Sequence, residues 1–240
     1  MAETIETDRD WRAFYDAITE GAGEQELFRQ VGRTLGGQPI GPEQITLAAG
    51  DTIDALQLGR SDVLLDLCCG NGLVTKRLAA VCQWVYGVDI SRGLLWGACQ
   101  YHAAKNIRYI QAAATELRPA EFDARPPTKA CMIFALQHFT SRELEQVLER
   151  IRAVAGGPVP VYFADIPDVD HLYDFYNTPE RRADFARRRA AGTEAIGTWW
   201  NRGHLTEIFA KAGYEVEFRD QSPARYAAHY RFDLLALPIP

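Results

Sequence analysis

The feature that most constrains the fold is an alternation of short apolar runs with helical patterns along the middle of the chain. The short runs are typical of strands, and the stretches between them have the period of helices. Strands joined by helices form right-handed crossovers, which build a parallel sheet covered on both faces. We therefore predict an α/β fold with a doubly wound, mostly parallel sheet, whose parallel strands are Val63–Leu65, Trp84–Val88, Ile107–Gln111, Cys131–Phe134 and Val159–Ala164.

Helical patterns come before the first strand. They lie near Trp11–Ile18 and Gln25–Leu35, and a third begins at Pro42, a favoured first residue of a helix, and continues to about Leu56. We expect residues 1–58 to form a helical cap.

The end of the chain departs from the alternation of strands and helices. Tyr214–Phe218 and Arg231–Leu237 have the pattern of strands, but the gap between them is too short for a crossover. We expect these two strands to pair antiparallel at one edge of a sheet of about seven strands. Residues 168–202 form an insertion before them, and we expect a single domain over residues 1–240.

Composition and charge exclude several classes of protein. The chain has 26 Lys and Arg and 32 Asp and Glu, which gives a formal net charge of −6. This balance argues against broad binding to nucleic acid or to an anionic membrane, because both rest on clustered positive charge. We find no pattern of a secretory signal or of a membrane span. The five cysteines lack the spacing of metal ligands, so we expect reduced thiols in a cytoplasmic protein and no metal site.

A glycine-rich loop, Asp66-Leu67-Cys68-Cys69-Gly70-Asn71-Gly72, follows the first predicted strand. In a doubly wound sheet, ligands bind beyond the carboxyl ends of the strands, where the strand order reverses. Glycine lets the backbone approach a ligand closely, and the helix after the loop offers unpaired N–H groups. The dinucleotide fingerprint G-x-G-x-x-G, aligned on Gly70, needs glycine where this chain has Cys68 and Leu73, so we do not expect a dinucleotide.

The segment Leu64–Gly72 resembles the first motif of the class I S-adenosylmethionine-dependent methyltransferases, hydrophobic-hydrophobic-Asp-x-Gly-x-Gly-x-Gly. Tyr86–Ser91 looks like the second strand of that family with its ribose-binding acid, and Cys131–His138 looks like the fourth strand and its exit. Trp199–Val216 resembles the family's late helix and strand. The resemblance covers roughly residues 45–220. It implies a Rossmann-like methyltransferase fold that binds S-adenosylmethionine and releases S-adenosylhomocysteine.

The resemblance also assigns roles to single residues. Gly70 and Gly72 let the loop pass close to the methionine part of the cofactor, and Asp66 anchors the loop or the amino group of the cofactor. Asp89 accepts hydrogen bonds from both ribose hydroxyls, because the two oxygens of a carboxylate suit a vicinal diol. Tyr15 lies in an aromatic segment similar to one that closes over the cofactor in small-molecule members. The alternative for Tyr15 is packing in the core.

Two positions depart from the family pattern. Cys68 stands where the first glycine of the loop usually lies, so the loop must accept a side chain there. Ala113 stands where the family often has an aspartate that contacts the adenine amino group. We therefore expect the adenine to be held by the backbone near Ala114 and Thr115 and by apolar packing from Ile90.

The insertion is rich in aromatic residues. In the resembling family, this position and the N-terminal helices usually cover the acceptor, and an aromatic lid would exclude water and orient the nucleophile. The alternative is that the aromatic side chains pack a helical cap on the core. Arginines at positions 181, 182 and 187–189 would suit an anionic acceptor, but we favour a solvated helix face. The predicted acceptor contacts are Tyr173, Tyr176, Trp199 and Trp200.

The exit of the fourth strand supplies the candidates for chemistry. We expect Ala135 to contact the cofactor and His138 to act as a general base, because its ordinary pKa near 6.5 suits that role at neutral pH. Asp165, at the end of the fifth strand, and His171, just after it, compete for the role. Alternatively, His138 caps the next helix and methyl transfer needs only proximity.

The acceptor is expected to be a small molecule, methylated on oxygen or nitrogen. The segment after the fourth strand, 135–139, lacks the Asn/Asp-Pro-Pro-Tyr/Phe motif of nucleic-acid amino methyltransferases. Two alternatives remain open: a protein or tRNA methyltransferase, which would have an open groove, and a non-catalytic scaffold, which would bind no cofactor. We expect a monomer or homodimer that binds neither nucleic acid nor membrane.

Overall fold

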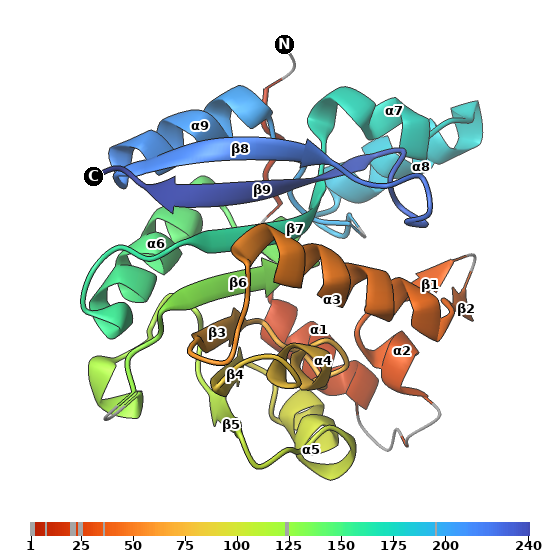
Figure 1. Ribbon diagram of the computed structural model, residues 1–240. Coiled ribbons are helices and arrows are strands. Elements are labelled where there is room, and N and C mark those ends of the chain that lie inside the picture. Colours follow the sequence, from red (N-terminus) through yellow and green to blue (C-terminus); the bar gives the residue numbers. More distant parts are fainter. Residues whose placement is uncertain are drawn as a thin grey trace.

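The computed structural model describes residues 3–7, 9–19, 23, 26–35, 37–122, 125–194 and 196–240. A seven-stranded sheet with the order β5-β4-β3-β6-β7-β9-β8 runs through its centre (Figure 1). Neighbouring strands are parallel except where β9 pairs antiparallel with β7 and β8, as the sequence predicts. The strands are β3 (Val63–Leu67), β4 (Trp84–Asp89), β5 (Ile107–Gln111), β6 (Lys129–Ile133), β7 (Val161–Pro167), β8 (Tyr214–Asp220) and β9 (Arg231–Pro238).

The strand order reverses beside β3. The chain passes from β3 outward to β4 and β5, and then returns to the other side of β3 to form β6. The loops after β3 and β6 therefore leave the same edge of the sheet in opposite directions. The crevice between such loops is where ligands bind in doubly wound sheets.

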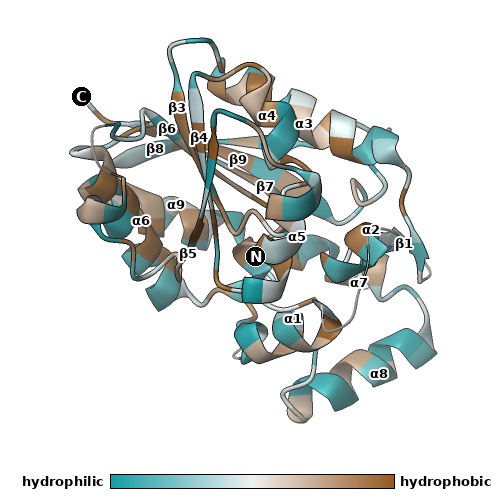
Figure 2. Cartoon of the chain, turned by 90° about the horizontal axis from the view of Figure 1, so that it is seen from below, coloured by the Kyte–Doolittle hydropathy of each residue, from teal (hydrophilic) through white to brown (hydrophobic). Residues whose placement is uncertain are grey.

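Helices cover both faces of the sheet. On one face, α3 (Pro42–Leu56) and α4 (Thr75–Ala79) pack in a cluster with alternate residues of the central strands, including Leu64, Val85 and Cys131. On the other face lie α6 (Ser141–Ala155) and α9 (Arg202–Lys211), and Figure 2 shows these two pairs of helices on opposite sides of the strands. A further helix, α5 (Arg92–Tyr101), packs against β4 and β5.

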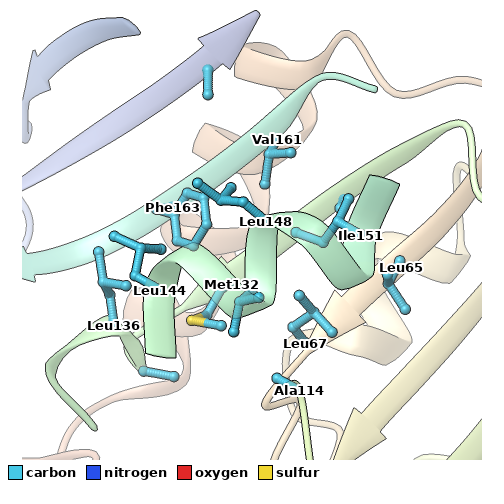
Figure 3. Packing of buried hydrophobic residues seen from close by; sticks show 14 of the residues in the cluster. Leu65, Leu67, Ala114, Met132, Leu136, Leu144, Leu148, Ile151, Val161 and Phe163 are labelled. Carbon is cyan, nitrogen blue, oxygen red and sulfur yellow. The ribbon is translucent and has the colours of Figure 1, made fainter. Parts of the chain in front are cut away.

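Helix α6 illustrates how the sequence builds this core. The helix starts at a capping box in which the hydroxyl of Thr140 accepts a hydrogen bond from the N–H of Glu143, and the carboxylate of Glu143 accepts one from the N–H of Thr140. The cap is thus Thr140, the residue before the helix. Apolar residues at helical spacing then face the sheet (Figure 3), and burying each contributes about 1.5–3 kcal/mol. They are Leu144, Val147, Leu148, Ile151 and Val154.

The N-terminal region differs in part from the prediction. Helix α1 (Trp11–Thr19) forms as expected, but the helix predicted over Gln25–Leu35 is shorter than expected, because in the described part of that range the α-helix α2 covers Leu27–Gln30. Gly32 has φ +66°, which ends the helix, and the chain continues into a short antiparallel pair, β1 (Thr34–Leu35) with β2 (Gln38–Pro39). Gln25 itself lies outside the described residues.

The insertion forms the short helices η4 (Val169–His171) and α7 (Leu172–Phe175) and the longer α8 (Pro179–Ala190). Its aromatic residues join a separate buried cluster that includes Phe185, Trp199 and, from the β8–β9 connection, Tyr230. In Figure 2, α8 lies at the periphery and is mostly hydrophilic.

Candidate active site

The glycine loop begins at Asp66, which is 2% exposed near the end of β3. One carboxylate oxygen accepts a hydrogen bond of 2.6 Å from the hydroxyl of Thr75 in α4, and the other accepts one of 3.5 Å from the thiol of Cys131 in β6. Burial raises the pKa of Asp66 to about 6, although the bonds from Thr75 and Cys131 oppose the shift. Asp66 therefore ties the start of the loop to the next helix and to the neighbouring strand.

The loop uses three residues with left-handed backbone. Cys68 has φ +55°, so the loop does accept a side chain in a conformation that favours glycine. Gly70 has φ +58°, and a Cβ there would lie 2.8 Å from the side chain of Val31. Gly72 has φ +80°, but a Cβ on it would meet the hydroxyl of Tyr109. Gly72 is thus needed for packing behind the loop, and it does not line the cavity described below.

Asp89, the last residue of β4, closes the loop from the other side. Its Oδ2 accepts the N–H of Gly70 at 2.8 Å, and its Oδ1 accepts the N–H of Ser91 at 2.9 Å. Burial raises the pKa of Asp89 to about 6 against the effect of these bonds. Each carboxylate oxygen has a second lone pair, so the group can still accept hydrogen bonds from a ligand.

A cavity of about 430 Å³ lies over this loop, at the carboxyl ends of the parallel strands. Its wall brings together residues from four strand exits and from the N-terminal segment. Ten residues predicted from the sequence line it: Tyr15, Asp66, Cys68, Gly70, Asp89, Ile90, Ala114, Thr115, Ala135 and His138.

His138 ends the short helix η3 (Leu136–His138) and faces helix α1. Its Nε2 shares a hydrogen bond of 2.9 Å with the hydroxyl of Tyr15, and its ring centroid lies 4.1 Å from that of Trp11. Burial, with a smaller effect of the charges on Arg231 and Arg9, lowers the pKa of His138 to about 3. The imidazole is therefore neutral at physiological pH and a much weaker base than the ordinary pKa predicts.

Asp165 lies outside the cavity, in a buried ionic network. Its Oδ2 accepts hydrogen bonds from Arg225 at 2.7 Å and from Arg33 at 3.3 Å, and Arg231 donates to its carbonyl oxygen. Burial alone would raise the pKa of Asp165, but the guanidinium groups of Arg225 and Arg33 lower it to about 2. A carboxylate held in this way is a poor proton acceptor, so the geometry gives Asp165 a structural role.

The remaining predicted residues also lie away from the cavity. The imidazole of His171 is exposed and pairs with Asp174 at 2.6 Å. Tyr173 is 56% exposed, whereas the other three predicted acceptor contacts are buried and pack in the core, as the alternative interpretation held. These three residues are Tyr176, Trp199 and Trp200, and their placement does not support contact with an acceptor in this cavity.

Sequence reasoning missed several wall residues. Arg33 reaches the cavity from the turn after α2, and its guanidinium carbon lies 4.0 Å from the ring centroid of Phe134, which also lines the wall. Arg9 and Trp11 line it from the start of α1. Only the aromatic character of the N-terminal segment signalled this wall, because Arg9 and Arg33 belong to no motif.

Two other kinds of feature are absent from the described ranges. No helix there is long and apolar enough to cross a membrane. No group of three or more His, Cys, Asp or Glu side chains there is placed to hold a metal ion. All five cysteines have free thiols.

Comparison with known proteins agrees with this architecture. Residues 64–156 match the family described as "Methyltransferase domain". A 75-residue stretch, 31% of this chain, is 35% identical to the probable cobalt-precorrin-6B C(15)-methyltransferase (decarboxylating) of Methanocaldococcus jannaschii. That stretch spans 39% of the relative's length.

Solved structures are similar over nearly the whole chain. Magnesium protoporphyrin IX methyltransferase (ChlM) from Synechocystis, with bound S-adenosylhomocysteine, has a TM-score of 0.62 at 15% identity, covering 95% of this chain and 98% of that one. A methyltransferase from Anabaena variabilis has a TM-score of 0.65 at 16% identity, with 98% and 97% covered. The likeness shows a shared fold. Together with the match of residues 64–156 to a methyltransferase domain, it shows a Rossmann-like methyltransferase fold around the loop from Asp66 to Asp89.

Proposed function

We propose that this chain transfers a methyl group from S-adenosylmethionine to an oxygen or nitrogen of a small-molecule acceptor. The observation that carries the proposal is the cavity over the glycine loop, which holds a buried carboxylate, a close-approach glycine and an apolar end within about 430 Å³. Methyl transfer is a displacement at a carbon with a good leaving group, so alignment of the two substrates does most of the work.

The residues of the wall fit the parts of this cofactor. The second lone pairs of the Asp89 carboxylate would accept the two ribose hydroxyls. The adenine would lie between Ile90 and the segment 113–115, which offers small side chains and backbone groups. Gly70, at φ +58°, would admit the methionine chain, and the Arg33 guanidinium would face its carboxylate. The bound cofactor supplies an activated methyl group.

A small acceptor suits the closure of the cavity better than a protein or tRNA does. Helix α1 contributes Trp11 and Tyr15 to the wall, so the N-terminal segment lies over part of the cavity and narrows the space through which a polymer could enter. The hydrogen bond between Tyr15 and His138 fastens this cover to the exit of β6. A covered cavity also excludes water from the reacting groups.

Calorimetric titration with S-adenosylhomocysteine tests the proposal. The wild type should bind, and Asp89→Ala should lose about 1.5–3 kcal/mol of binding free energy, because charge-assisted hydrogen bonds to a buried diol are lost. Asp184→Ala, on the exposed helix α8, is the matched control and should bind as the wild type does. NAD should not bind. Absence of binding by the wild type would favour the scaffold alternative, and equal affinity of Asp89→Ala would remove Asp89 from the ribose role.

A further inference from the structure

One wall of the cavity is built from three stacked groups, Arg9, Trp11 and His138, which we call the donor wall. The guanidinium carbon of Arg9 lies 5.1 Å from the ring centroid of Trp11 and 4.3 Å from that of Phe14. The indole of Trp11 in turn lies 4.1 Å from the imidazole of His138, measured between centroids. A cation, an indole and an imidazole thus line the cavity side by side.

The hydrogen-bonding groups of the donor wall lack partners in the described part of the chain. The Nε1 of Trp11 and the Nδ1 of His138 are both buried without a hydrogen bond. The Nε2 of His138 shares its hydrogen bond with the hydroxyl of Tyr15, so Nδ1 is a donor in the tautomer in which Nε2 accepts and an acceptor in the other tautomer, whereas the Nε1 of Trp11 is always a donor. A buried polar atom without a partner is costly, and two such atoms on neighbouring residues of one cavity wall indicate that a ligand pairs with them.

The positive charge of Arg9 is also not neutralised by a carboxylate of the cavity wall. Its guanidinium forms no salt bridge with a carboxylate of the described residues and lies over the rings of Trp11 and Phe14. The four carboxylates of the cavity wall are engaged elsewhere, with a hydroxyl group or with backbone N–H groups: Asp10, Asp66, Asp89 and Glu143. The wall therefore combines a positive charge, the N–H donor of Trp11 and an unpartnered nitrogen of His138.

We propose that the methyl acceptor is an oxyanion, a carboxylate or a phosphonate or phosphate group, bound against the donor wall. This assignment rests on the proposed function and names its acceptor class. One oxygen of the anion attacks the methyl carbon, the carbon–sulfur bond breaks, and its electron pair remains on the sulfur. The products are a methyl ester and the neutral thioether.

The chemistry of the wall agrees with such an acceptor. An oxyanion carries no proton on its nucleophilic oxygen, so the step needs no general base. The depressed pKa of His138, caused mainly by burial, keeps the imidazole neutral and suits a hydrogen-bond donor better than a base. An anion beside the sulfonium charge of the donor also neutralises the pair in a cavity with little water.

Calorimetric titration of the protein saturated with S-adenosylhomocysteine tests this assignment. The probes are benzoate, phenylphosphonate and the neutral isostere benzamide. We expect one or both anions to bind at least tenfold more tightly than benzamide, and the tighter of the two identifies the acceptor group. Arg9→Gln should weaken anion binding by about tenfold or more, and Trp11→Phe, which keeps a ring but removes the N–H, by about threefold to tenfold.

The control is Arg187→Gln, an exposed arginine of helix α8 outside the cavity, which should bind the anions as the wild type does. Urea denaturation curves of Arg9→Gln and Trp11→Phe that match the curve of the wild type show that these variants are folded. Equal affinity for benzoate, phenylphosphonate and benzamide, an equal loss in Arg187→Gln, or no anion binding to the saturated wild type would overturn the assignment. Failure of the wild type to bind S-adenosylhomocysteine would instead overturn the proposed function.

Discussion

Replacing Asp165 with asparagine should destabilise the folded chain by on the order of 3–5 kcal/mol, because it leaves the buried guanidinium of Arg33 without its carboxylate partner and that of Arg225 with Asp51 alone. The side chains of Asp165, Arg33 and Arg225 are 0%, 6% and 1% exposed, so water cannot replace the lost partner. Asparagine tolerates the φ of +62° at this position, so backbone strain does not add to the loss. For a chain of this size the change corresponds to a fall in Tm of about 6–20 °C.

Urea denaturation of the wild type and Asp165→Asn measures this loss. The matched control is Asp184→Asn, whose carboxylate also pairs with two arginines, Arg187 and Arg188, but on the exposed face of α8. That variant should denature almost as the wild type does, because exposed ion pairs contribute little. The expected loss in the free energy of unfolding is about 3–5 kcal/mol. If the free energy of unfolding of Asp165→Asn lies within about 1 kcal/mol of the wild-type value, the network does not hold Arg33 in place and our reasoning is refuted.

The pH dependence has a definite sign. The folded pKa of Asp165 is lowered to about 2, below its ordinary value, so its stabilising effect is complete above about pH 4. The effect is lost as the pH falls from there toward 2. The difference in stability between the wild type and Asp165→Asn should therefore shrink over that range and stay constant above it.

Two further predictions concern the glycine loop. Gly72→Ala should cost about 1–3 kcal/mol of folding free energy and weaken S-adenosylhomocysteine binding, because the new Cβ meets the Tyr109 hydroxyl. The control is Gly50→Ala, in open space on α3, which should stabilise the fold by about 0.5–1 kcal/mol. Denaturation curves of the two variants measure both effects. The affinity for S-adenosylhomocysteine should fall as the pH drops through about 6, where Asp89 takes up a proton. Calorimetry at pH 8, 6 and 5 measures this, and a constant affinity would contradict the ribose role of Asp89.

The fold and the cofactor half of the site could be predicted from the sequence because both depend on local patterns. The βα alternation specifies a parallel sheet, and Asp66, Gly70 and Asp89 stand at strand exits, where the topology forces them together. The φ of +55° at Cys68 could not be predicted from residue preference, because it depends on how the loop meets β4, where the N–H of Cys69 donates to the carbonyl oxygen of Val88. The sequence also does not reveal that Gly72 makes room for Tyr109, because the two residues are 37 positions apart in the chain.

The acceptor half of the site was harder to predict, because it depends on tertiary packing. Aromatic residues serve equally well as a lid or as core, and Trp199 and Trp200 are fully buried core residues. The ordinary pKa of histidine suggested a base at His138, but burial and nearby guanidinium charges change its chemistry. Arg33 could not be recognised, because its role follows from the distant residues Asp165 and Phe134 that fix its guanidinium at the wall.

The central claim, that the cavity over the glycine loop binds the methyl donor, is tested most directly by a crystal structure of the protein soaked with S-adenosylhomocysteine. We expect the ribose hydroxyls within hydrogen-bond distance of Asp89, the adenine against Ile90 and Ala114, and the sulfur facing the donor wall. Density for the ligand at any other place, or the ribose turned away from Asp89 in this cavity, would contradict the account.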